Sequence, residues 1–323
     1  MINKISDNFY CITLPMPFRL KHVHVYALVN NQEVALFDTG FNISGFYEIL
    51  ERDLESIGQS MQSVRDIYIT HSHADHCGMA GLIKEKSGAT IHISAAADES
   101  NQNHWKTDLI ILRMKKFYLA HGLTEQEIGA LIMMFSSIRD IMTIFKGDDF
   151  LQPNEIREFG KWQFEVIFTP GHTNGHICFY FPKDGFLLSG DTVLPQITPN
   201  LSPDLFDENF RPLFSFLESL KAVENLSVDK IYPGHGNVFS DIKIRVSEMR
   251  EHHAQRTQLI LNCLGREPKT TFQVSCEIFG RDLSPFDRFL ALNETYVHLL
   301  ELRHKNIIRE EQMGDNLVYI TGK

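Results

Sequence analysis

The chain has 323 residues, 43% of them hydrophobic and 22% charged, a composition that excludes disordered and fibrous proteins. Five cysteines without regular spacing exclude a disulfide framework and favour a reducing compartment, and a net charge of −10 disfavours duplex DNA or an anionic membrane as a partner. No signal peptide is visible at the N-terminus, and the most apolar stretch, 130–145, contains Arg139 and Asp140. That stretch is too short and too charged to cross a bilayer, so we expect a cytoplasmic protein with no membrane partner.

Short strands and helices alternate over the first 97 residues. Helical periodicity predicts helices at 44–57 and 79–86, the second ending at Gly88. Apolar and β-branched runs predict strands at 8–14, 23–29, 33–37, 66–70 and 89–94. This alternation is typical of helices packed on sheets.

A helical segment interrupts the alternation at about residues 95–150. Periodicity predicts helices at 108–121 and 124–145, and Thr124 with Glu127 forms a capping-box pattern. Because strands resume after this segment, we interpret it as an insertion. Its apolar face has no evident partner in the strand-rich part of the sequence, and we expect it to cap the substrate cleft or to contact a second subunit. This face includes Leu131, Met134, Phe135, Ile138 and Met142.

The remainder of the chain divides into a strand-rich and a helical part. Strands are predicted at 162–168, 176–181, 185–188 and 230–232, with a helix at 211–223. After Ser240, helices at 245–264 and 287–304 and a final strand at 317–321 follow. We therefore expect a catalytic domain at 1–240 and a small, mostly helical, winged-helix-like domain at 241–323. The second contains 12 basic and 12 acidic residues, so we expect it to pack on the catalytic domain or a second subunit, with no nucleic-acid role.

The strongest chemical signal is the sequence Thr-His-Ser-His-Ala-Asp-His at 70–76. His71 and His73 lie two residues apart after a predicted strand and can therefore point the same way. Asp75 and His76, at the start of the next helix, can turn toward a neighbouring position. Imidazoles and a carboxylate suit zinc and similar divalent metals.

Three further clusters also follow predicted strands, with Gly or Pro shaping each turn. They are Thr-Pro-Gly-His-Thr at 169–173, Ser-Gly-Asp-Thr at 189–192 and Pro-Gly-His-Gly at 233–236. Each contains one candidate metal ligand: His172, Asp191 and His235. Loops at one edge of a sheet framework can converge on a single point, so we expect these side chains to meet the 70–76 segment.

Together, the motifs H-x-H-x-D-H, PGHT, SGD and PGHG resemble those of the metallo-β-lactamase superfamily. The resemblance covers about residues 1–97 and 151–240, and the segment 194–200 resembles a branch with a helical insertion and a C-terminal extension. It implies an α+β fold: an αββα sandwich of two sheets between helices, with the helical insertion and the small winged-helix-like C-terminal domain added to it.

The resemblance also implies a ligand set and a mechanism. The first metal would be bound by His71, His73 and His172. The second would be bound by Asp75, His76 and His235, with Asp191 bridging the two. We expect two zinc ions per chain, rather than iron or manganese, sharing a bridging hydroxide as nucleophile. Asp75 and Asp191 would orient that hydroxide and take a proton, so they are the expected catalytic residues.

The function expected first is hydrolysis of an acyl bond, a thioester or a lactone, of a small cytosolic substrate. Two alternatives remain open: a phosphodiesterase or endoribonuclease on the same site, and a mononuclear iron persulfide dioxygenase. The acidic first 240 residues argue against a polyanionic substrate, because phosphate contacts need Lys and Arg. The acidic segment 309–312 argues against a glutathione thioester, since glyoxalase II enzymes grip glutathione with a basic C-terminal region. A homodimer is a possible assembly.

Other polar side chains near the motifs are assigned supporting or ordinary roles. Asp38 is expected to orient a nearby ligand or turn, and Cys77 to be a small buried side chain. The other histidines are expected to be ordinary core or surface residues: His22, His24, His92, His104, His121, His176, His252, His253, His298 and His304.

Overall fold

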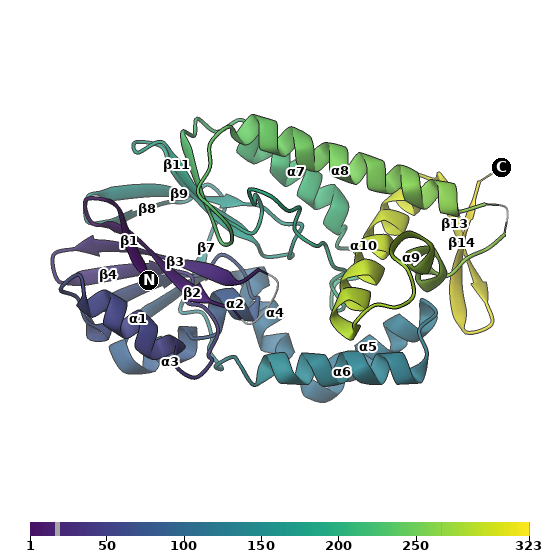
Figure 1. The fold of residues 1–323 in the computed structure, drawn as a ribbon, viewed down its shortest axis with the longest axis horizontal. Helices are drawn as coiled ribbons and strands as arrows, with labels where there is room; N and C mark the ends of the chain where they lie inside the picture. Colours follow the sequence, from purple (N-terminus) through teal and green to yellow (C-terminus); the bar gives the residue numbers. More distant parts are fainter. Residues whose placement is uncertain (17–19, 266, 323) are drawn as a thin grey trace.

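The computed structural model describes residues 1–16, 20–265 and 267–322. Two sheets form the strand-rich half of the molecule (Figure 1). The first sheet has the order β1 (Ile2–Ser6), β2 (Phe9–Pro15), β3 (His22–Asn30), β4 (Glu33–Phe37), β5 (Val64–Tyr68), β6 (Thr90–Ser94) and β7 (Asp149–Leu151). The second has the order β12 (Lys230–Pro233), β11 (Phe186–Gly190), β10 (Ile177–Phe181), β9 (Trp162–Phe168) and β8 (Ile156–Phe159).

Alternating side chains give each sheet two apolar faces. In β3, Tyr26 and Leu28 enter the core between the sheets, whereas Val25 and Ala27 face the helices outside the first sheet. The inner core is rich in aromatic rings, among them Phe37, Phe164, Phe179 and Phe181. Both sheets are therefore buried on both faces over most of their area, which explains why their strands are almost continuously apolar.

Helices cover both outer faces and complete the predicted αββα sandwich. On the first sheet lie α1 (Phe46–Glu55) and α3 (Ala80–Ser87), which bury Leu50, Leu54 and Ile83 against it. On the second lie α7 (Pro212–Glu224) and the first half of α8 (Ile242–Cys263), which share one apolar cluster with that sheet. The short elements η1 (Met61–Ser63) and α2 (Ala74–Cys77) flank β5. The α+β fold class is thus confirmed.

The helical insertion is confirmed, but it has three helices where the sequence predicted two. They are α4 (Ala95–His104), α5 (Thr107–Ala120) and α6 (Glu125–Arg139). The first begins where the Ser94 side chain accepts a hydrogen bond from the Ala97 amide. The predicted helix 124–145 ends at Arg139; its apolar continuation, including Met142, is instead buried as a loop in the core of the sandwich.

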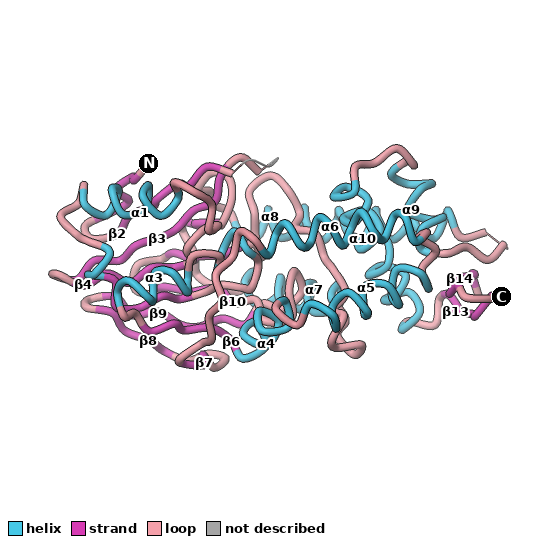
Figure 2. The backbone as a smooth tube through the Cα atoms, turned by 90° about the horizontal axis from the view of Figure 1, so that it is seen from below, coloured by secondary structure: helices cyan, strands magenta, loops and turns pink. Residues whose placement is uncertain are grey.

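The C-terminal part contains α8, α9 (Thr271–Phe279), α10 (Pro285–His304) and the hairpin of β13 (Ile308–Met313) with β14 (Asn316–Thr321). Seen from below, the helices α5, α6, α9 and α10 gather at the end of the molecule away from the two sheets, with the hairpin beyond them (Figure 2). The strand β13 was not predicted, because its sequence is polar over Glu310, Glu311 and Gln312.

The apolar face of the insertion finds its partner within the same chain. Leu131, together with Met114 and Tyr118 of α5, packs around Leu292 of α10. The ring of Phe135 meets that of Phe289 of α10 with centroids 4.9 Å apart. The insertion and α10 therefore bury one another, and Leu131, which is 1% exposed, does not line a substrate pocket or a subunit contact. For Met134, Phe135 and Ile138, which are partly exposed, such a contact stays a prediction.

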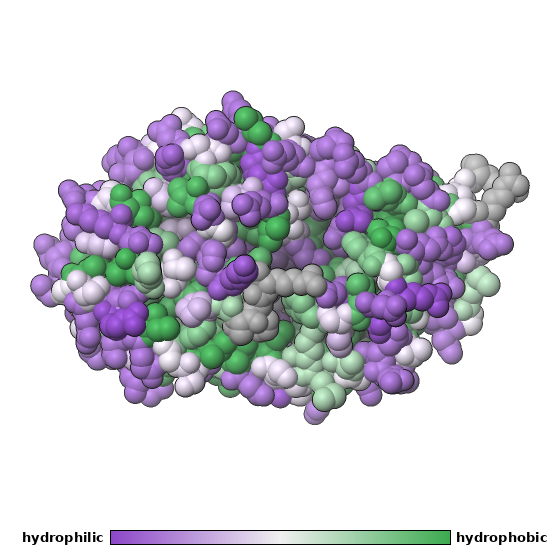
Figure 3. All heavy atoms as spheres, in the orientation of Figure 1, coloured by the Kyte–Doolittle hydropathy of each residue, from purple (hydrophilic) through white to green (hydrophobic). Residues whose placement is uncertain are grey.

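No helix in the described part of the chain combines the length and apolarity required to cross a membrane. The face shown in Figure 3 is predominantly hydrophilic and is hollowed near its centre, between the sandwich and the helical end. The short helix α2 lies in this middle region (Figure 1).

Candidate metal centre

The sheet topology brings the predicted ligands to one edge of the sandwich. In the first sheet, β4 and β5 are parallel, so the segments that follow them, at Asp38 and at residues 70–76, leave the sheet side by side. In the second sheet, β11 and β12 are parallel with Gly190 opposite Pro233. The residues directly beyond these positions include Asp191 and His235. A hydrogen bond from the Ile177 amide to the Thr70 carbonyl, 2.9 Å long, ties the two edges together.

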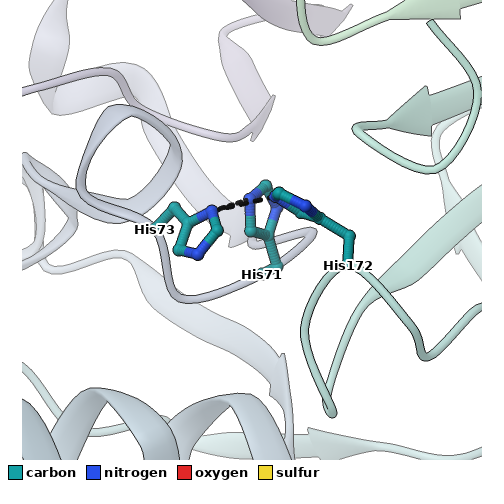
Figure 4. A group of neighbouring side chains, drawn as sticks. All are labelled: His71, His73 and His172. Atoms are coloured by element: carbon teal, nitrogen blue, oxygen red, sulfur yellow. Dashed lines mark hydrogen bonds between the residues drawn. The ribbon is translucent and has the colours of Figure 1, made fainter. Parts of the chain in front are cut away.

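Three histidines converge in a first cluster, His71 and His73 from the loop after β5 and His172 from the loop after β9 (Figure 4). The Nδ1 atom of His73 lies 3.1 Å from Nε2 of His71 and 2.9 Å from Nε2 of His172. His71 is fully buried and His172 is 9% exposed.

A second cluster consists of Asp75, His76 and His235. The Nε2 atoms of His76 and His235 lie 3.3 Å apart, and His235 Nε2 lies 3.2 Å from Asp75 Oδ2. Asp191 stands between the clusters: its Oδ2 is 3.7 Å from His172 Nε2 and 3.5 Å from His235 Nε2. All seven side chains predicted as ligands from the sequence are therefore brought together.

The hydrogen-bond network decides which nitrogens of the first cluster carry lone pairs. The Thr70 hydroxyl donates to the Asp38 carboxylate, so Thr70 Oγ1 accepts a proton from Nδ1 of His71, 3.0 Å away. His172 donates from Nδ1 to the carbonyl of Asn200 across 2.7 Å. In both rings Nε2 is therefore left unprotonated, and both Nε2 atoms point at the same place.

The second cluster is arranged by the same principle. His76 donates from Nδ1 to Asp38 Oδ2, and His235 donates from Nδ1 to the carbonyl of His22, each across 2.7 Å. Both Nε2 atoms then face the carboxylates of Asp75 and Asp191. Such outer partners are what orient imidazole ligands on a metal.

The electrostatics of the two clusters differ when no cation is present. Burial and the neighbouring His172 lower the pKa of His73 to about 3, so this cluster is neutral. Burial disfavours the charged form of His235 too, but the carboxylates of Asp191 and Asp75 outweigh it and raise its pKa to about 10. The second cluster therefore attracts positive charge strongly.

The donor set fits a metal. Asp191 Oδ1 is buried and has no hydrogen-bond partner among the described residues, although an unsatisfied buried carboxylate oxygen is costly. Nitrogens of five imidazole rings approach one another to 2.9–3.3 Å. In four of these rings Nδ1 donates to an acceptor outside the site, so Nε2 is the nitrogen directed at it. Donors about 2.0–2.2 Å from a tetrahedral cation stand roughly this far apart.

One supporting residue was predicted from the sequence, and several others escaped the sequence analysis. Asp38 was expected to orient a ligand, and it accepts the His76 proton. His176, interpreted as an ordinary core residue, accepts the Asp191 amide proton at Nε2 across 3.0 Å. The carbonyls of His22 and Asn200 were missed because a backbone acceptor leaves no signal in residue type. Cys77 is fully buried, as predicted, and burial raises the pKa of its thiol well above the usual range.

Known proteins are similar to this chain in sequence and in fold. The chain is 23% identical to a probable metallo-hydrolase, YqjP, of Bacillus subtilis, over 98% of this chain and 99% of that protein. It is 21% identical to an atrochrysone carboxyl ACP thioesterase of Passalora fulva, over 86% of this chain and 69% of that protein. The crystal structure of a metallo-beta-lactamase family protein of Thermus thermophilus superposes with a TM-score of 0.87 at 28% identity, covering 99% of this chain and 100% of that one.

The family model of the metallo-beta-lactamase superfamily matches residues 19–235, which include all seven clustered side chains. That span contains the strands from β3 to β12 and the helical insertion, so motif, fold and site agree. This chain belongs to the metallo-β-lactamase superfamily and is a metal-binding hydrolase of that superfamily.

Proposed function

We propose that the protein is a dinuclear zinc hydrolase that cleaves an acyl bond, a thioester or a lactone, of a small substrate. His71, His73 and His172 would hold one zinc ion. Asp75, His76 and His235 would hold the other. Asp191 would bridge them.

The observation that carries this proposal is the position of the Asp191 carboxylate. Its two oxygens lie 3.4–3.7 Å from ligand nitrogens of both clusters, at His76, His172 and His235. A single carboxylate that faces two sets of converging donors is suited to bridging two cations. The second set, with its own lone-pair orientation, favours two ions over the single iron of a persulfide dioxygenase.

The chemistry would divide between the ions and two carboxylates of the chain. Two bound zinc ions would lower the pKa of a shared water toward neutrality and polarise the scissile carbonyl. Asp75 has the more accessible carboxylate, with 15% of its side chain exposed against 8% for Asp191. Asp75 is therefore placed to orient the attacking water and accept its proton. Asp191 is held by His235 and by the hydrogen bond that its backbone amide donates to Nε2 of His176.

An acyl substrate is supported by the name of one relative and by the negative net charge of this chain. The similar protein of Passalora fulva is named an atrochrysone carboxyl ACP thioesterase, and a thioester is an acyl bond. The net charge of −10 disfavours a polyanion such as RNA, since phosphate binding depends on Lys and Arg. We further propose a cytoplasmic protein, supported by the free state of Cys11, Cys77, Cys178, Cys263 and Cys276.

The test combines metal analysis with an activity screen. The purified protein is expected to hold two zinc ions per chain and to hydrolyse acyl thioesters or lactones, but not bis(p-nitrophenyl) phosphate or RNA. Asp191→Ala should lose hydrolysis and at least one ion while keeping its circular dichroism spectrum. Asp184→Ala, in the exposed turn between β10 and β11, is the matched control and should behave as wild type.

Other results would favour one of the alternative functions or contradict the mechanism. Cleavage of the phosphodiester or RNA would establish the nuclease alternative. A single iron with oxygen consumption on a persulfide would establish the dioxygenase. Full activity of Asp191→Ala would contradict the two-metal mechanism.

A further inference from the structure

The segment that follows Asp191, residues 192–206, is held from outside the sandwich. Arg245 of α8 donates from Nε to the carbonyl of Leu194 across 2.6 Å and from its guanidinium to the carbonyl of Ile197 across 2.8 Å. Most of the Arg245 side chain is buried, at 11% exposure. The first half of the segment is thus fixed by the C-terminal part of the chain.

The insertion holds the other end of this segment. Arg113 of α5 donates to the carbonyl of Leu205 across 2.7 Å, and its guanidinium lies over the ring of Phe206 at 4.7 Å from the centroid. The segment therefore spans between α8 and α5, both of which lie outside the two sheets.

The middle of the segment contacts the metal centre directly. The carbonyl of Asn200 accepts the Nδ1 proton of His172, which leaves Nε2 free to bind a cation. The side chain of the same asparagine donates from Nδ2 to Ser202 Oγ across 3.0 Å. Leu201 between them is 1% exposed and anchors the segment in the apolar cluster under α7.

Ser202 also receives a hydrogen bond from α10. Asn293 donates from Nδ2 to Ser202 Oγ across 3.2 Å, and its Oδ1 accepts from the Tyr118 hydroxyl of α5 across 3.3 Å. Asn293 is 1% exposed and Tyr118 is 2% exposed. A buried amide that loses its partner bears the full cost of desolvation, so these bonds fix the position of Ser202 relative to α10.

We propose that Asn293 is a positioning residue for the metal centre: through Ser202 it holds the Asn200 carbonyl where that carbonyl orients His172. This inference rests on the proposed function only in taking His172 as a metal ligand. Asn293 lies on α10, about 90 residues after this segment in sequence. The helix α10 would thus contribute to metal binding as well as to the apolar packing against the insertion.

The test measures metal binding rather than turnover. Metal-free protein is titrated with Co²⁺ and followed by visible absorption, with a competing chelator to obtain affinities. In Asn293→Ala, one of the two ions should bind about tenfold more weakly, with altered absorption bands, because partners behind a ligating histidine contribute about 10–100-fold to affinity. Ser202→Ala, a half-buried loop substitution that the fold tolerates more readily, should produce the same loss.

Thr295→Val is the matched control. Thr295 lies on the same helix, is fully buried, and donates only to the Ala291 carbonyl, so its loss should lower the Tm without changing either Co²⁺ affinity. If Asn293→Ala and Ser202→Ala bind both ions as tightly as wild type, the positioning role is overturned. If wild type binds two ions but hydrolyses no acyl substrate, the proposed function fails while this inference stands; if wild type binds no Co²⁺, both fail.

Discussion

Nδ1 of His76 donates a hydrogen bond to Oδ2 of Asp38 across 2.7 Å, and both side chains are almost completely buried. Asp38 follows β4, whereas His76 lies in α2 after β5, so the parallel pairing of these strands makes the contact. Asp38 has a positive φ of 62°, and its carboxylate faces Thr70 and His76. This carboxylate therefore decides which nitrogen of His76 is free for a cation.

Asp38→Asn should weaken one metal site selectively. An amide at this position can present a donor where His76 needs an acceptor, and the proton would then move to the nitrogen that should bind the cation. We expect an affinity loss of about 10–100-fold for one of two ions, measured by chelator competition. Asp53→Asn, a buried carboxylate on α1 that pairs with Arg52, is the control and should leave both affinities unchanged. Equal affinities in Asp38→Asn and wild type would contradict this role.

Leu292→Ala should weaken the packing between the insertion and the C-terminal part and so destabilise the fold. Leu292 is fully buried among Met114, Tyr118 and Leu131, so truncation should lower the free energy of unfolding by about 2–5 kcal/mol in urea denaturation. Leu112→Ala on α5, where the side chain is 63% exposed, should change it by less than about 0.5 kcal/mol. A similar effect of the two substitutions would show that α10 does not hold the insertion.

Acidification should destabilise the fold through the buried pair His253 and His298. Burial lowers the pKa of His298 to about 3 and that of His253 to about 4, against about 6.5 in an unfolded chain. Between these limits the unfolded chain binds more protons than the folded one, so their contribution is complete above pH 6.5 and falls as the pH drops. Each group contributes at most about 1.4 kcal/mol per pH unit.

This pH dependence can be isolated with a single variant. Urea unfolding of metal-free protein at pH 7.5 and pH 5.5 should show a smaller difference for His298→Gln than for wild type, because glutamine does not titrate. Identical differences for the two proteins would show that this pair does not carry the effect.

The 323-residue protein is expected not to bind nucleic acid. The two arginines of α10 are engaged in ion pairs, Arg288 with Glu127 at 3.0 Å and Arg303 with Glu310 at 2.7 Å. Arginines that are already paired with carboxylates are not free to bind phosphates and displace their counterions. Even the non-specific affinity for nucleic acid should therefore be weak. Gel-shift assays with duplex DNA and RNA at low salt test this, and micromolar binding that weakens with added salt would contradict it.

Much of the secondary structure was predictable because its cause is local. Strands such as β3 and β10 are apolar runs ended by turn residues, and α6 begins at the capping box of Thr124 and Glu127. The helix α4 was missed because its sequence lacks apolar periodicity. Its polar Asn101 is fully buried, and its amide donates to the Phe145 carbonyl, a contact 44 residues away.

The sequence alone determined which side chains could bind a metal, because ligand chemistry belongs to residue type and each motif directly follows an apolar strand. Tertiary structure decided where the protons lie: His76, His172 and His235 are oriented by Asp38, Asn200 and His22, acceptors 38, 28 and 213 residues away. It also decided that α10 buries the insertion and, through Asn293, reaches the Asn200 segment. Contacts of this kind join distant parts of the chain, and two of the three acceptors are backbone carbonyls, which every residue has. For that reason a pattern of residue types could suggest Asp38 but could not reveal the two carbonyls or the contact of α10.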